Sequence, residues 1–98
     1  MDKPMTRKYE LMVIMKPLLP DNVRKNIQDK IAKLISDGNG KIVEKEVWGK
    51  KYLAYEIKKQ NEGYYIVYQI TLSPDALDEI KKEFDLTGEI LRYLFVKK

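Results

Sequence analysis

The side chains best suited to bind another molecule in this sequence are basic residues beside aromatic ones. Lys50 and Lys51 follow Gly49 directly, and Trp48 and Tyr52 flank this group. Cationic groups beside exposed rings suit RNA, because phosphates bind the charges while unstacked bases or sugars contact the rings. The alternative interpretation is that these lysines only keep a hairpin soluble.

Arg92 is the basic residue that is hardest to explain by solubility, because it lies within the apolar segment ILRYLFV. An arginine among apolar strand residues is costly unless it faces water or a paired anion. Further basic residues occur near both ends of the chain. The candidate contacts for a nucleic acid are therefore Arg7, Lys8, Lys50, Lys51, Arg92 and Lys97.

The composition favours an anionic partner and argues against catalysis. Lys and Arg number 19 against 15 Asp and Glu, and the net charge of +4 modestly favours nucleic acid. The sequence has no Cys and no His, which excludes disulfides, thiolate or imidazole metal sites, and Cys or His catalysis. No glycine-rich phosphate loop opens a predicted helix. We therefore expect no enzyme, no cofactor, no metal and no small-molecule substrate.

Hydrophobic patterns predict the elements that position these residues. Strands are predicted over residues 9–15, 41–57, 64–72 and 90–96, and amphipathic helices over residues 23–35 and 77–84. We expect Asp21 or Asn22 to cap the first helix and the long extended segment to bend at Gly49. A polar turn over residues 58–63 should join the two middle strands into a hairpin.

The order β-α-β-β-α-β predicts the α+β ferredoxin-like fold, in which both helices pack on one face of a four-stranded antiparallel sheet. With 98 residues the chain should form one domain, residues 1–98, with a flexible lead-in over residues 1–6. No signal segment is visible, and no apolar run approaches the ~20 residues that span a bilayer. We therefore expect a cytoplasmic protein that does not bind a membrane.

Strand alternation sorts the apolar residues by face. The helix-facing set should be Tyr9, Leu11, Val13, Met15, Tyr64, Ile66, Tyr68, Ile70, Leu91, Tyr93 and Phe95. The opposite face should carry Met12, Ile14, Tyr65, Val67, Leu94 and Val96. A face that meets only water alternates more cleanly than this. Strand-forming residues scattered on a half-exposed sheet are one interpretation; we favour an apolar patch for a protein partner, because three strands contribute.

An RNA-recognition motif has the same topology, but the residues depart from its pattern. That motif stacks bases on aromatic residues of its first and third strands. Here Glu62 stands where the pattern has Lys or Arg, and Tyr65 stands where it has Gly or Ala. We therefore set this interpretation aside.

Four segments occur in the right order across nearly the whole chain: RKYE at residues 7–10, WGKKYLAYEI at 48–57, GYY at 63–65 and LRYLFVK at 91–97. In these segments the sequence resembles the bacterial small-subunit ribosomal protein S6 family. The segment WGKKYLAYEI is the most specific of them. Lys51 stands where the family commonly has Arg, so a point charge replaces a forked phosphate contact.

The resemblance implies a structural role in the small ribosomal subunit, binding to small-subunit rRNA, and a heterodimer with ribosomal protein S18. It also implies that the basic residue before Tyr9, the basic pair after Gly49, and Arg92 contact the rRNA. We assign the uncovered apolar face to S18 as our own hypothesis. The competing interpretation is a ligand-binding regulatory module with the same topology.

Overall fold

The computed structural model describes residues 6–98. In chain order its elements are β1 (Arg7–Met15), α1 (Asp21–Asp37), β2 (Lys41–Ile57), β3 (Gln60–Leu72), the short 3-10 turn η1 (Pro74–Ala76), α2 (Leu77–Asp85) and β4 (Ile90–Lys97). This order confirms the predicted ferredoxin-like fold. The predicted flexible lead-in lies outside the described residues, except for Thr6.

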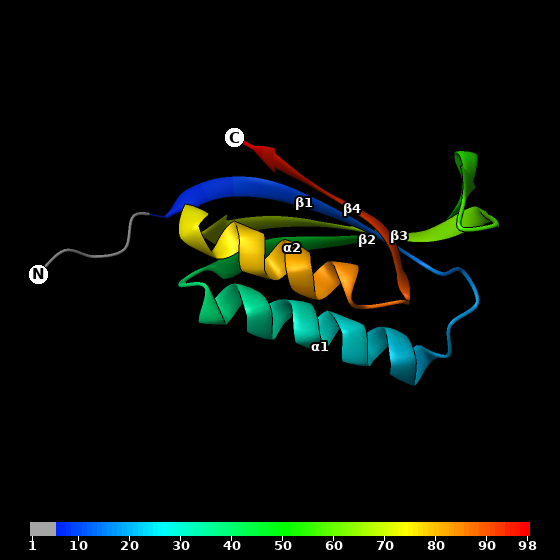
Figure 1. Ribbon diagram of the computed structural model, residues 1–98, viewed down its shortest axis with the longest axis horizontal. Coiled ribbons are helices and arrows are strands. Elements are labelled where there is room, and N and C mark those ends of the chain that lie inside the picture. Colours follow the sequence, from blue (N-terminus) through cyan, green and yellow to red (C-terminus); the bar gives the residue numbers. More distant parts are fainter. Residues whose placement is uncertain (1–5) are drawn as a thin grey trace, which may run out of the picture.

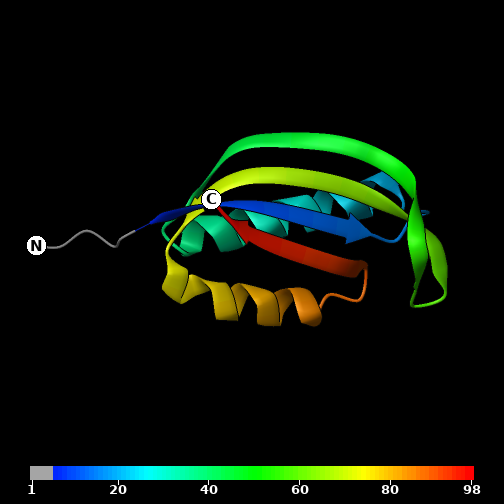
Figure 2. The same cartoon turned by 90° about the horizontal axis from the view of Figure 1, so that it is seen from above.

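The strands form one antiparallel sheet in the order β2-β3-β1-β4. Figure 1 shows both helices on the same side of this sheet, and Figure 2 shows the four strands lying side by side. The sheet therefore has one face that the helices cover and one that they leave uncovered. We call the uncovered side the open face.

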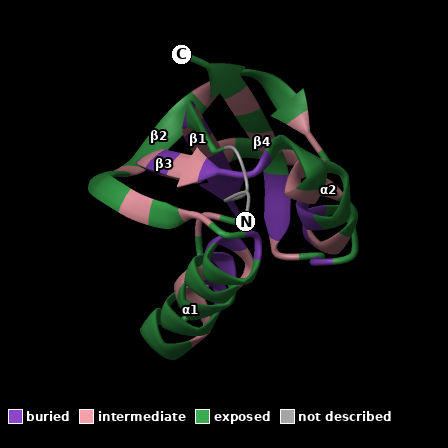
Figure 3. Ribbon diagram, turned by 90° about the vertical axis from the view of Figure 1, so that its left-hand side faces the viewer, coloured by how far each residue is buried: buried purple, intermediate pink, exposed green. Residues whose placement is uncertain are grey.

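The hydrophobic core lies between the sheet and the helices. Leu11 and Val13 of β1 have no exposed surface, because alternate side chains of this strand point toward the helices. The buried stripe of α1 consists of Ile27, Ile31 and Ile35, which recur at helical spacing. Figure 3 shows these buried segments facing each other across the two layers. Burial of each such side chain contributes roughly 1.5–3 kcal/mol to folding.

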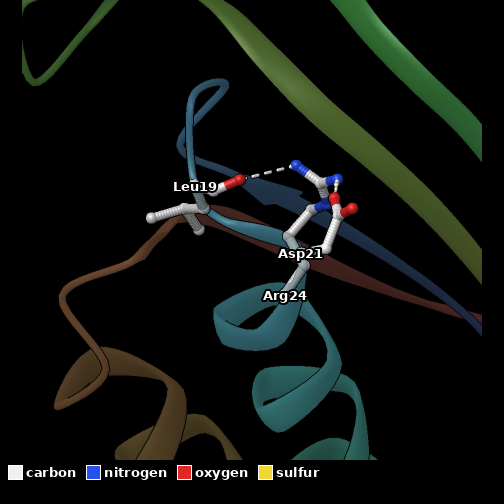
Figure 4. A network of polar contacts seen from close by, with 3 residues as sticks. All are labelled: Leu19, Asp21 and Arg24. Carbon is white, nitrogen blue, oxygen red and sulfur yellow. Dashed lines mark hydrogen bonds and ion pairs between the residues drawn. The ribbon is translucent and has the colours of Figure 1, made fainter.

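The start of α1 differs by one or two residues from the sequence prediction. Pro20 is the N-cap in place of Asp21 or Asn22, and no side chain caps the helix. Asp21 instead lies in the first turn, where the helix dipole favours a negative charge. Arg24 stabilises this end of the helix. Its guanidinium donates a 2.8 Å hydrogen bond to the Leu19 carbonyl and also pairs with the Asp21 carboxylate (Figure 4).

The hairpin between β2 and β3 is tighter than the sequence predicts. Its turn is formed by Lys58 and Lys59, whose φ angles are 50° and 65°, in place of the predicted polar turn over residues 58–63. Positive φ at both positions gives a two-residue turn that matches the twist of the strands, so β3 begins at Gln60. The predicted bend at Gly49 is confirmed by its φ of 81° and by a register shift at this point.

A bulge changes the face of one predicted core residue in β4. The register of β1 against β4 shifts between Ile14 and Met15, so that Ile14 opposes Arg92 while Met15 opposes Ile90. Ile90 joins the core, and Leu91 is buried outside it. Ile90, rather than the predicted Leu91, therefore supplies the helix-facing side chain at this end of β4.

Candidate protein and nucleic-acid interface

The open face carries apolar side chains from β3, β1 and β4. Residues paired across neighbouring strands share a face, so the register identifies them. Two adjacent rows across these strands are Val67-Met12-Leu94 and Tyr65-Ile14-Arg92. Val96 continues the face opposite Glu10. All of the apolar residues predicted for this face lie on it, and none of them belongs to the core on the helix side.

These apolar residues differ widely in exposure. On the edge strand β4, 53% of Leu94 and 44% of Val96 are exposed. On the inner strands, only 7% of Ile14 and 5% of Val67 are exposed. The other two residues are half-buried. Inner-strand side chains have neighbours on both sides, and Ile14 is also covered by the hairpin.

The tip of the β2–β3 hairpin folds over the open face at the end of β1. It turns away from the helices in Figure 1 and crosses the end of β1 in Figure 2. Leu53, Ala54 and Tyr55 near the tip line the same cavity as Ile14. Gly63, farther along β3, also packs closely on Ile14, since a Cβ added to it would lie 2.4 Å from Cγ2 of Ile14. The cavity has a volume of about 210 Å³, and its walls also include Leu94 of β4. The site thus includes a pocket as well as a flat sheet.

Arg92 lines this cavity and contacts the hairpin tip. Its guanidinium donates a hydrogen bond to the Tyr55 hydroxyl and lies 5.8 Å from the centroid of that ring. Both residues are exposed, so this cation–π contact stabilises the protein by only about 0.5–1 kcal/mol. The arginine is tolerated among apolar strand residues because its charge faces water and a hydroxyl acceptor.

An aromatic stack lies where the sequence places lysines beside rings. Trp48 and Tyr65 stack with their ring centroids 6.3 Å apart and their planes 14° apart. The Nζ atom of Lys51 lies 5.7 Å from the centroid of the Trp48 ring, and 44% of this tryptophan is exposed. An exposed indole beside an ammonium group offers a stacking surface and a positive charge together, which is the chemistry that binds unpaired nucleotides.

Known proteins that resemble this chain share one description. The family model for "Ribosomal protein S6" matches residues 8–97. The small ribosomal subunit protein bS6 of Symbiobacterium thermophilum is 40% identical over 91 residues, which are 93% of this chain and 96% of that relative. The bS6 protein of Desulforudis audaxviator is 38% identical over 92 residues, which are 94% of this chain and 98% of that relative.

The chain belongs to the ribosomal protein S6 family. A crystal structure of 30S ribosomal protein S6 from Thermotoga maritima has the same fold, with a TM-score of 0.88 at 35% identity, over 96% of this chain and 89% of that one. The protein is therefore a structural, non-enzymatic component of the small ribosomal subunit, and it is ribosome-associated. The regulatory-module interpretation is set aside on this ground.

Within residues 6–98, no helix of this S6-family protein has the length and apolar character that a membrane crossing requires.

The predicted basic contacts do not form one patch in this S6-family protein. By register, the open face carries Lys8, Lys51 and Arg92, and the helix side carries Arg7, Lys50 and Lys97. Lys8 and Arg92 share a face as predicted, but Arg92 opposes Ile14 at the other end of β1. At about 3.3 Å per residue the two are separated by ~20 Å along the strand. Of these predicted contacts, only Lys51 and Arg92 lie at the hairpin end of the open face.

Reasoning from the sequence missed an acidic strip on the open face, formed by Glu10, Glu44 and Glu46. Glu44 and Glu46 are exposed on the edge strand β2, opposite open-face residues of β3. Glu10 lies in the same row as Glu44, accepts a 2.9 Å hydrogen bond from the Gln69 amide, and lies 3.7 Å from the Lys98 ammonium. The spacing of Glu44 and Glu46 was visible, but a register shift before Glu44 determines their face.

Proposed function

We propose that this S6-family protein binds small-subunit rRNA together with ribosomal protein S18, and that it uses separate parts of the open face for the two partners. The observation that carries the proposal is the contrast along this face: exposed apolar side chains occupy β4, whereas cationic and aromatic groups gather beside the hairpin. Apolar surface that a chain leaves exposed in a patch is typical of protein interfaces. Charges beside rings are typical of RNA contacts.

The rRNA is proposed to contact the hairpin end of the face. Lys51 and Trp48 supply a charge and a stacking surface, and Arg92 supplies a guanidinium that is still exposed beside Tyr55. The remaining predicted contacts lie at the other strand ends or on the helix side, where they are placed to reach different phosphates. They are Arg7, Lys8, Lys50 and Lys97.

S18 is proposed to cover the apolar residues of the open face. Leu94 and Val96 are about half exposed in a strand whose other face is packed into the core. Their buried neighbours Ile14 and Val67 form the base of this apolar patch. A fully buried apolar centre with a polar rim is the usual anatomy of a stable protein interface.

The RNA part of the proposal is tested by salt dependence. Lys51→Ala and Arg92→Ala should each weaken binding to small-subunit rRNA, measured with S18 present, and should each reduce the slope of log affinity against log salt by about 1. Lys33→Ala, an exposed substitution on α1, is the matched control and should leave the slope unchanged. Equal slopes for all three variants would contradict the assignment.

The proposed contact with S18 is tested by introducing a charged residue among the apolar residues of the open face. Leu94→Asp should weaken the S18 heterodimer by tenfold or more, because about 1–3 kcal/mol of apolar contact and desolvation is lost. Leu86→Asp is the control, since Leu86 is 74% exposed at the end of α2 on the other side of the molecule. Heterodimer affinity that is the same for both variants would rule out the open face as the S18 surface.

A further inference from the structure

We infer that S18 adds an extended segment to the outer edge of β4, so that the sheet gains a fifth strand in the complex. This inference rests on the proposed function, in which S18 covers Leu94 and Val96 of the same strand. It adds the way in which the backbone of the partner is held and its place on the sheet. Three features of β4 carry it: free backbone groups, a lack of edge protection, and aromatic side chains beside the edge.

The backbone of β4 has hydrogen-bonding groups that point away from the sheet. The Lys98 amide donates a hydrogen bond to the Lys8 carbonyl. Because bonded and non-bonded pairs alternate in an antiparallel ladder, the even-numbered residues of β4 from 92 onward bond to β1. β4 is the last strand in the order β2-β3-β1-β4, and none of the backbone hydrogen bonds within residues 6–98 uses its outward groups. These outward groups belong to Tyr93, Phe95 and Lys97.

The other edge of the sheet is protected against strand pairing, whereas β4 is not. The edge strand β2 shifts register against β3 at three places and contains Gly49 with its φ of 81°, and such bulges discourage pairing. In contrast, β4 keeps a constant register against β1 from Arg92 to Lys97. The segment YLFV between these two residues contains no charge, glycine or proline. A regular, uncharged edge of this kind is where another strand adds.

Helix α2 offers a surface beneath the position that an added strand would take. Figure 2, which shows the sheet from above, places α2 beyond β4 rather than under the middle of the sheet. Tyr93 and Phe95 pack toward the core on this side, and both are only partly buried. The Tyr93 hydroxyl donates a 2.8 Å hydrogen bond to Asp85, and the Lys81 ammonium lies 5.9 Å from the centroid of the Phe95 ring. Apolar side chains of an added strand would pack beside these two rings, as cross-strand neighbours do.

The spacing of the free groups specifies a polypeptide rather than RNA. Outward N–H and C=O groups recur at every second residue, ~7 Å apart, and an extended peptide offers matching acceptors and donors at the same interval. Pairing from Tyr93 to Lys97 needs a segment of about five residues. Its residues opposite Tyr93 and Phe95 should be apolar, and so should the residue between them, which would lie beside Leu94 on the open face.

The position of the edge favours S18 over a second copy of this chain. Leu94 and Val96 are about half exposed and belong to β4 itself, so a partner that covers these side chains also reaches the edge. Two copies that paired edge to edge would leave both side chains uncovered on the open face. One partner that adds a strand and covers the face satisfies the backbone and the apolar side chains together.

Backbone esters, introduced by semisynthesis of the full chain, test the hydrogen bonds. An ester in place of the Phe95 amide removes one outward donor and keeps the side chain. It should weaken the heterodimer with purified S18 about fivefold, as expected for the loss of one hydrogen bond. An ester at Val96 is the matched control, because the Val96 amide bonds to β1. It should destabilise the isolated protein more than the Phe95 ester does and weaken the heterodimer less. Unchanged affinity for the Phe95 ester would overturn the inference.

Amide hydrogen exchange, followed residue by residue by NMR, tests the added strand as a whole. The Tyr93 and Phe95 amides should exchange rapidly in the isolated protein and at least tenfold more slowly in the heterodimer with purified S18. The Leu94 and Val96 amides are the control within the same strand and should exchange slowly in both states, because they bond to β1.

Three outcomes of the exchange experiment would contradict the inference in distinguishable ways. A heterodimer in which the Tyr93 and Phe95 amides still exchange rapidly would overturn the fifth strand and leave the proposed S18 contact in place. Slowing that depends on the concentration of the isolated protein would assign the edge to a second copy of this chain and overturn the inference. Failure of S18 to bind at all would refute the proposed function, and the inference with it.

Discussion

The two faces of the sheet use the same kinds of apolar residues but differ in what covers them. On the helix side, Leu11 and Val13 have no exposed surface, whereas about half of Leu94 and Val96 is exposed on the open face. From Tyr9 onward the helix side of β1 is apolar without interruption, whereas on the open face the charged residues Lys8 and Glu10 precede the apolar residues Met12 and Ile14. A face that mixes apolar and charged residues is suited to cover by another molecule rather than by its own chain.

The two ends of the open face differ as clearly as the two faces do. The hairpin end combines a cavity with Arg92 and Lys51. The opposite end carries charges of both signs, because Glu10 and Glu44 lie in one row and Lys8 and Lys41 in the next, and Glu10 pairs with Lys98. The cavity and the aromatic stack therefore distinguish the hairpin end.

The largest expected effect is the difference in stability loss between a leucine of the core and a leucine of the open face. Leu11→Ala should lower the free energy of unfolding by about 2–5 kcal/mol, because it leaves a cavity among fully buried side chains. Leu94→Ala should lower it by less than about 1 kcal/mol, because much of Leu94 already contacts water. Urea denaturation of the isolated protein measures both values. Similar losses for the two variants would mean that the faces do not differ as described.

A smaller effect is expected where the hairpin meets the sheet. Gly63→Ala should lower the free energy of unfolding by about 1–3 kcal/mol, because the added methyl group would lie 2.4 Å from Cγ2 of Ile14. The Ile14→Ala background removes that atom, so the cost of Gly63→Ala should be clearly lower there. A double-mutant cycle by chemical denaturation measures the difference. Additive costs would show that Gly63 does not pack against Ile14.

The sequence predicted the elements that a hydrophobic pattern specifies and missed those that depend on tertiary packing. The short continuous apolar run in β1 and the helical spacing in α1 correctly identified the strand and the buried stripe, because burial selects apolar residues in these patterns. The turn was predicted over residues 58–63, longer than the two-residue turn at Lys58 and Lys59, since neither residue type signals positive φ. The cavity was missed as well, because the fold-back of the hairpin onto Ile14 is a long-range contact.

The smallest expected effect lies in the core, at the Tyr68 hydroxyl. This group is buried and has no hydrogen-bond partner among the described residues, so Tyr68→Phe should change the free energy of unfolding by less than about 1 kcal/mol at neutral pH and is expected to raise it. Thermal or urea unfolding measures the change. A large loss would show that the hydroxyl has a bonding role.

The same residue should make the stability of the protein depend on pH in alkaline solution. Burial raises the pKa of Tyr68 above its usual value, so the unfolded chain releases this proton at a lower pH than the folded protein does. The contribution of the protonated Tyr68 hydroxyl to the free energy of unfolding is therefore fully present below about pH 10. As the pH rises above that value, the free energy of unfolding should fall. Tyr68→Phe should fall less steeply in unfolding experiments across this range, and identical slopes would contradict the assignment.

The most direct measurement of the difference between the faces is thiol labelling, because the sequence contains no cysteine. Leu94→Cys and Leu86→Cys place one thiol on the open face and one on the helix side, at positions that are 53% and 74% exposed in wild type. Both should react rapidly with a maleimide in the isolated protein. In assembled small subunits, labelling of Leu94→Cys should slow at least tenfold if the open face is covered by a partner, and equally rapid labelling in both states would contradict that central claim.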